Sequence, residues 1–273
     1  MKRKSLNLLS MYWTVSKFII VAILSTLIFS CSDEEKPVAK DQPKKETLSF
    51  EEKIARQVEA DLNIPATEKY DLKIKEDYID TDTIKDALIL VNREEWAYKR
   101  MESAQNESFM EKTGFVGPYN YVFVKLGNKD DLLKAPPVGS AAYDKLDSKF
   151  LTLTSQAQKD FYVNYRIRNS QHRNYYTVRN DRLYLTFSCP VFDSIGEPKP
   201  RVFAIKHPES SVRIANDIAV YDGKIVGYDP ENIEDPNRYV PEQIIPMKDL
   251  YVYFIFDEKS MKYKTPMVPK EKN

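Results

Sequence analysis

This chain of 273 residues has few of the residues from which most recognisable active sites are built: two histidines, two cysteines and seven glycines. His172 and His207 do not have the His-x-x-x-His spacing of a zinc site, and neither lies near a nucleophile motif. No glycine-rich loop is present that could hold a phosphate. Hydrolysis by two acids distant in the sequence stays open as an alternative. We therefore expect a non-catalytic protein that requires no cofactor.

Long hydrophobic runs are also missing. The apolar run from Phe18 to Phe29 has about a dozen residues, whereas a membrane-spanning helix needs about 20. A basic start precedes the run, and small Ser30 and then Cys31 follow it. Residues 1–30 therefore predict a signal peptide that is cleaved before Cys31, and a transmembrane anchor is the alternative. Met11 is a second candidate for the true start.

The residues around Cys31 resemble two known signals. Ile28-Phe29-Ser30-Cys31 resembles a bacterial lipobox, which implies that Cys31 is diacylated and anchors the chain in a membrane. The acids that follow resemble the export signal of surface-exposed outer-membrane lipoproteins of the Bacteroidota; it consists of Ser32, Asp33, Glu34 and Glu35. This resemblance implies a lipoprotein on the outer face of the outer membrane. The alternative is that the acids begin a solvated tether on a protein of the periplasmic face.

The cysteine content and net charge of the remaining chain limit which disulfides and which partners are expected. If Cys31 carries lipid, Cys189 has no partner for an intramolecular disulfide. Residues 31–47 are polar and contain two prolines, which predicts a flexible tether. Residues 48–273 then form a single β-rich globular domain, with a possible subdivision near 127–158. Removal of the four basic residues of the signal leaves 37 basic and 41 acidic residues, a net charge of −4, so nucleic acid is not an expected partner.

Periodicity predicts the elements of this domain. Ser49 and Glu52 form a capping box before an apolar stripe at Phe50, Ile54, Val58 and Leu62, which predicts an amphipathic helix. Tyr70, Leu72 and Ile74 alternate with polar residues as in a half-buried strand, and the fully apolar segment 87–91 predicts a strand covered on both faces. A second helix is expected after residues 92–95, and a further strand over 119–126.

The C-terminal half is predicted to be antiparallel sheet. Alternation places one set of side chains on a common core face: Phe161, Val163, Tyr165, Ile167, Tyr176, Val178, Leu183, Leu185, Phe187 and Cys189. Asn180-Asp181 and Asp222-Gly223 predict hairpin turns, and a final strand pair surrounds residues 257–260. The expected fold is mainly β, a sandwich or propeller-like, with an N-terminal amphipathic helix and one or two further helices, α+β overall.

An acidic loop is the first candidate site. Asp80, Asp82 and Asp86 precede the apolar segment 87–91 and resemble the Asp-rich loop of FG-GAP or VCBS repeats. The resemblance implies a calcium site with these three ligands, although Tyr78 stands where the first Asp belongs and Thr83 where the usual glycine belongs. The alternative is that the acids cap turns beside a strand.

A face rich in arginine and tyrosine is the second candidate site. The residues opposite the predicted core face are Tyr162, Arg166, Arg168, Tyr175, Arg179, Arg182 and Tyr184. Guanidinium groups and tyrosine rings offer bidentate contacts to anions and flat stacking surfaces. The face predicts binding of a glycan, an acidic protein patch or a lipid headgroup. An ordinary solvated face paired with nearby carboxylates is the alternative.

Two functions remain open from the sequence. In the first, the protein is a lipid-anchored, non-catalytic subunit or accessory of an outer-membrane protein complex for import, secretion or assembly. In the second, it is a surface adhesion module that binds glycans and has a degenerate calcium loop.

Overall fold

The computed structural model describes residues 48–104 and 114–266. The predicted signal peptide, Cys31, the export signal and the tether lie outside the described residues. The described residues belong to one compact unit, which begins at Leu48.

The smaller of two sheets has five strands: β1 (Asp71–Asp77), β2 (Asp86–Asn92), β3 (Val116–Lys125), β4 (Leu132–Lys134) and β5 (Val138–Ala141). β2 pairs with β1 and β3, and β3 pairs along its length with both β4 and β5. Every residue of β2 is buried, which confirms the prediction of a strand covered on both faces. The predicted strands over 70–75 and 119–126 correspond to β1 and β3.

The larger sheet has eight strands in sequence order. They are β6 (Asp147–Leu151), β7 (Asp160–Ile167), β8 (Ser170–Arg179), β9 (Arg182–Asp193), β10 (Arg201–Lys206), β11 (Ile218–Ile225), β12 (Ile244–Asp257) and β13 (Lys262–Lys264). All strand pairs among the described residues are antiparallel. Asn180 and Asp181 both have positive φ, as the predicted two-residue hairpin between β8 and β9 requires.

Two α-helices and one short 3-10 helix, η2 (Pro230–Asn232), are present in the described part of the chain. α2 (Phe50–Leu62) has the predicted capping box, with the Ser49 hydroxyl accepting from Glu52 and the Glu52 carboxylate accepting from Ser49. Ile54, Val58 and Leu62 are buried, whereas the prediction that Phe50 continues the buried stripe is wrong, because Phe50 is exposed. α3 (Glu94–Ala104) begins where the Asn92 side chain accepts from the Glu94 N–H.

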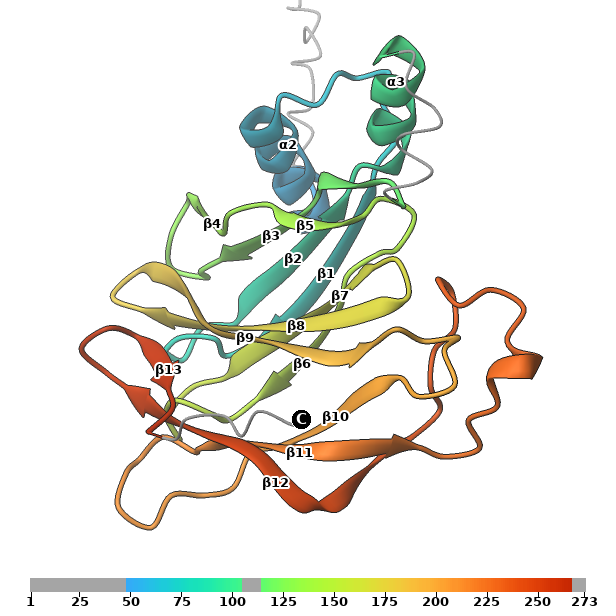
Figure 1. Cartoon of the computed structure of the whole chain (residues 1–273). Coiled ribbons are helices and arrows are strands. Elements are labelled where there is room, and N and C mark those ends of the chain that lie inside the picture. Colours follow the sequence, from blue (N-terminus) through green and yellow to red (C-terminus); the bar gives the residue numbers. More distant parts are fainter. Residues whose placement is uncertain (1–47, 105–113, 267–273) are drawn as a thin grey trace, which may run out of the picture. The chain divides into compact units, whose positions relative to one another are not determined.

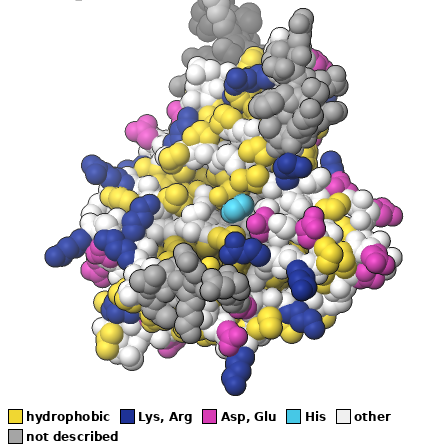
Figure 2. Space-filling view, in the orientation of Figure 1, with side chains coloured by type: hydrophobic (Ala, Val, Ile, Leu, Met, Phe, Trp, Pro, Cys, Tyr) yellow, Lys and Arg dark blue, Asp and Glu magenta, His cyan; other side chains and the backbone are white. Residues whose placement is uncertain are grey.

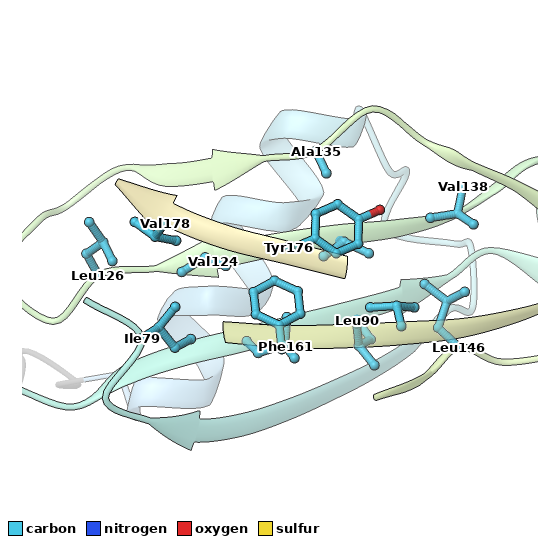
Figure 3. Close-up of a cluster of buried hydrophobic side chains, with 13 residues drawn as sticks. Ile79, Leu90, Val124, Leu126, Ala135, Val138, Leu146, Phe161, Tyr176 and Val178 are labelled. Atoms are coloured by element: carbon cyan, nitrogen blue, oxygen red, sulfur yellow. The ribbon is translucent and has the colours of Figure 1, made fainter. Parts of the chain in front are cut away.

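Packing divides the domain into layers. α2 covers one face of the small sheet through Ile54 and Val58, which contact the side chains of β2 and β3 (Figure 1). The other face packs on β7 and β8, and Figure 3 shows Leu90 and Val124 facing Phe161 and Tyr176 across this interface. β8 and β9 also pack their opposite face on β10 to β13, through a second cluster. The fold is therefore mainly β, and its sheets stack face to face as in a sandwich.

This stacking corrects the prediction that the large sheet has a single core face. Leu183 and Leu185 contact the small sheet, but Phe187 and Cys189 contact the β10–β13 side. The β8–β9 register shifts between Tyr175 and Tyr176, where one extra residue of β9 is accommodated and reverses its side-chain alternation. The predicted single core face is therefore wrong for Phe187 and Cys189.

The predicted hairpin at Asp222-Gly223 is also wrong. β11 continues through both residues to Ile225 and pairs with β12, with register shifts on either side of Tyr221. A Cβ atom on Gly223 would lie 3.0–3.1 Å from backbone atoms of Ala204 and Phe203. Glycine here permits a close approach of two strands rather than a turn.

Candidate functional site

The seven residues of the predicted arginine and tyrosine face do not form one solvated surface. Tyr175 has no exposed area and Arg166 is only 7% exposed, so both are unavailable to a partner. Arg168 and Arg182 are exposed, and Tyr162, Arg179 and Tyr184 are half-buried. The prediction of a single solvated face is wrong, because β10–β13 cover this side of the sheet at Tyr175 and form a second core there.

Arg166 has a structural role in the place where we expected a binding role. Its guanidinium donates to the carbonyl oxygens of Pro236, Asn237 and Tyr239 at 2.8–3.0 Å and to that of Arg168 at 3.2–3.3 Å. The group also lies 4.9 Å from the centre of the Phe192 ring. Arg166 thus fastens the long connection between β11 and β12 to the end of β7. Burial lowers the pKa of Arg166, although nearby carboxylates oppose the shift.

Part of the predicted face lies in a different cluster, between β8 and the end of β10. The Arg173 guanidinium lies 3.8 Å from the centre of the Tyr162 ring, and its Nε donates to Asn164 Oδ1 at 2.8 Å. The Tyr175 hydroxyl is 3.0 Å from His207 Nε2, and the two rings meet edge to face. We call Lys149, Tyr162, Arg173, Tyr175 and His207 the cationic cluster.

The charged side chains of the cationic cluster, Lys149 and Arg173, are both positive. Burial, followed by the positive charges of Arg173 and Lys149, lowers the pKa of His207 to about 4. His207 is therefore neutral at neutral pH. Among the described residues, no carboxylate lies within 4.0 Å of Arg173. Burial also raises the pKa of Cys189 to about 12, so this thiol stays protonated and unreactive.

Sequence reasoning missed the roles of Arg173 and His207. Arg173 lies on β8, which begins at Ser170 after a short turn. Extension of the β8 alternation would have shown that Arg173 and Tyr175 point to the same side. No local signal indicates that His207 approaches Tyr175, which is 32 residues distant in the sequence.

The connection between β10 and β11, residues 207–217, begins at His207 and presents two aliphatic side chains to solvent. Val212 is 80% exposed and Ile214 is 70% exposed. Polar residues surround them in the sequence, and Ala215 between this pair and β11 is buried. We call residues 208–217 the apolar loop.

The apolar loop is fastened to the sheet beneath it. Asn216 donates its backbone N–H to the Leu153 carbonyl at 2.7 Å, and Asp217 donates to the Pro208 carbonyl at 2.9 Å. The buried Asp217 carboxylate accepts from Arg213 at 2.8 Å and from the Tyr253 hydroxyl. These bonds restrain the loop while Val212 and Ile214 remain uncovered among the described residues.

The predicted acidic loop does bring its three carboxylates together. One oxygen from each of Asp80, Asp82 and Asp86 lies within 4.8 Å of the others, so the three could hold a cation. Burial and the charges of Asp86 and Asp82 raise the pKa of Asp80, although the N–H of Asp82 opposes the shift. A divalent cation would relieve this repulsion between carboxylates.

The same carboxylates also hold the loop together by hydrogen bonds. Asp86 accepts from the N–H groups of Ile79, Asp80 and Gly127 at 2.8–3.0 Å. Asp80 accepts from the Asp82 N–H, and Asp82 accepts from the Ile84 N–H at 2.7 Å. These contacts are those expected from acids that cap turns beside a strand, the alternative to a calcium site.

On the face seen in Figure 2, basic and acidic side chains are interspersed rather than gathered by sign. No helix within residues 48–104 and 114–266 is long and apolar enough to cross a bilayer. No protein-family model matches the chain, and the comparisons with curated proteins and with solved structures give no match either.

Proposed function

We propose that this protein is a lipid-anchored, non-catalytic binding subunit of an envelope protein complex, held on the outer membrane through Cys31. The anchor and address rest on residues 18–35, by resemblance to lipoprotein signals. The structural observation that carries the binding role is the apolar loop, which exposes Val212 and Ile214 on a restrained backbone.

The exposed aliphatic side chains and restrained backbone of the apolar loop favour a protein partner over a lipid surface. Burial of a Val or Ile side chain contributes about 1.5–3 kcal/mol, and a loop already held by internal bonds loses little conformational freedom on binding. Two aliphatic side chains flanked by polar residues are too few for stable insertion into lipid. They suit an apolar pocket on a protein of the envelope.

Co-purification from detergent-solubilised outer membranes tests this function. The tagged full chain should retain integral outer-membrane proteins, and a V212D/I214D variant should lose at least about tenfold of that material, since two apolar contacts are removed. V240D is the matched control, because Val240 is 71% exposed but lies outside the apolar loop. Absence of any integral membrane protein with the unmodified chain would contradict the proposed function, and equal recovery with V212D/I214D would contradict the role of the loop.

A second function, a surface glycan-binding module with a calcium loop, is favoured by the approach of Asp80, Asp82 and Asp86. A ligand at 100 times its dissociation constant stabilises a fold by about 2.7 kcal/mol. Excess calcium should therefore raise the melting temperature of the unmodified chain and leave that of D80N/D82N unchanged. An unchanged melting temperature for the unmodified chain would remove the metal from this function.

A further inference from the structure

Arg173 is a half-buried cation without an acidic partner among the described residues. Its Nε is occupied by Asn164, and one terminal nitrogen lies 3.5 Å from the Tyr175 hydroxyl, a weak contact. A guanidinium has five N–H donors, so most of its outer donors have no acceptor in these contacts. A half-buried guanidinium with free N–H donors gains favourable charge-assisted hydrogen bonds when an anion binds to it.

The neighbours of Arg173 hold it in position. The Tyr162 ring lies against the guanidinium, and the Asn164 amide oxygen fixes the direction of Nε. Stacking and a single fixed hydrogen bond orient a guanidinium while its remaining edge stays available. The geometry therefore resembles a prepared anion contact more than a structural clamp such as that of Arg166.

A second positive charge lies beside Arg173. Lys149 on β6 is opposite Tyr162 in the β6–β7 register and is exposed. The positive charges of Arg173 and Lys149 both lower the pKa of His207, in addition to the effect of burial. Two acidic positions lie two residues from this pair in the register. Asp147, opposite Asn164, is exposed and its charge acts on Lys75. Asp160, opposite Leu151, is buried and accepts hydrogen bonds from Thr154.

We propose that the cationic cluster is a binding site for a carboxylate group, with Arg173 as the bidentate contact and Lys149 as the second cation. A planar guanidinium matches the two oxygens of a carboxylate. The carboxylate would come from a sugar acid or from an acidic side chain, and the site uses no residue of the apolar loop, which begins directly after His207.

Titration calorimetry with the full chain tests the site and its ligand class. The probes are glucuronate, with glucose as its neutral control, and acetyl-glutamate amide, with acetyl-glutamine amide as its control. Binding of either acid without its neutral control supports the site, and the tighter acid identifies the source. Inorganic sulfate that binds more tightly than both acids would overturn the assignment to carboxylate.

Variants and one spectroscopic signal assign the residues. R173Q should weaken binding at least about tenfold and K149Q about threefold, whereas R182Q, which removes an exposed arginine of β9, should leave it unchanged. K149Q changes an exposed side chain, so it keeps the test valid if R173Q does not fold. In addition, bound carboxylate should raise the pKa of His207, followed by NMR of its imidazole, because it screens the two cations. Failure of both acids to bind, or unaltered binding by K149Q and R173Q, would overturn the proposal.

Discussion

His207 should make the fold sensitive to mild acid. Its pKa in the folded chain is about 4, against an ordinary value of 6.5, because burial and then the charges of Arg173 and Lys149 disfavour the imidazolium. The unfolded chain therefore takes up a proton that the folded chain does not. The stability associated with neutral His207 is fully present above about pH 6.5, is lost as the pH falls toward 4, and changes no further below that.

The size of the effect follows from the shift. A difference of one proton changes the free energy of unfolding by about 1.4 kcal/mol per pH unit, so the loss between pH 6.5 and 4 is up to about 3 kcal/mol. Urea denaturation followed by circular dichroism at pH 7, 6, 5 and 4.5 measures it. H207Q keeps a side chain that can bond the Tyr175 hydroxyl but does not titrate.

The decisive quantity is the difference between the two pH profiles. Burial lowers the pKa of His172 and raises the pKa of Asp160, but both groups are present in both proteins, so their contributions cancel. H207Q should be less stable than the unmodified chain at pH 7 or equal to it, and should lose less stability toward pH 4.5. Parallel profiles would refute the reasoning, since they would show that His207 is solvated in the folded chain.

Three further predictions concern other positions. R166M should lower the free energy of unfolding by about 3 kcal/mol, because four carbonyl groups lose a charged donor. It should also speed proteolysis within residues 226–243. Unchanged protection of these residues would refute the fastening role of Arg166. D86A should lower the free energy of unfolding, measured by urea denaturation, by about 2–4 kcal/mol even without calcium, because three N–H groups lose their acceptor. A loss of stability that appears only when calcium is present would instead identify Asp86 as a metal ligand. C31S should move the protein from the outer-membrane fraction to the soluble fraction and abolish incorporation of labelled fatty acid; unchanged fractionation would contradict the lipid anchor.

The local structure of this domain could be predicted from the sequence alone. The capping box at Ser49 and Glu52, the alternation of β1 and the Asn180-Asp181 turn depend on interactions between residues close in the chain, and all three are present. The mainly β character follows from the same short-range patterns. The acidic loop also came together as predicted, because Asp80, Asp82 and Asp86 are neighbours in the sequence.

Which side chains meet solvent depends on tertiary packing and could not be predicted from the sequence. Alternation separates the two faces of a strand, but it does not state whether a second layer covers the polar one, and here β10–β13 bury Tyr175. The register shift at Tyr175 reverses the later residues of β9, an event that no local pattern marks. The approach of His207 to Tyr175 depends on how the large sheet packs on itself, because contacts between distant residues are fixed by the packing of whole layers and not by local preference.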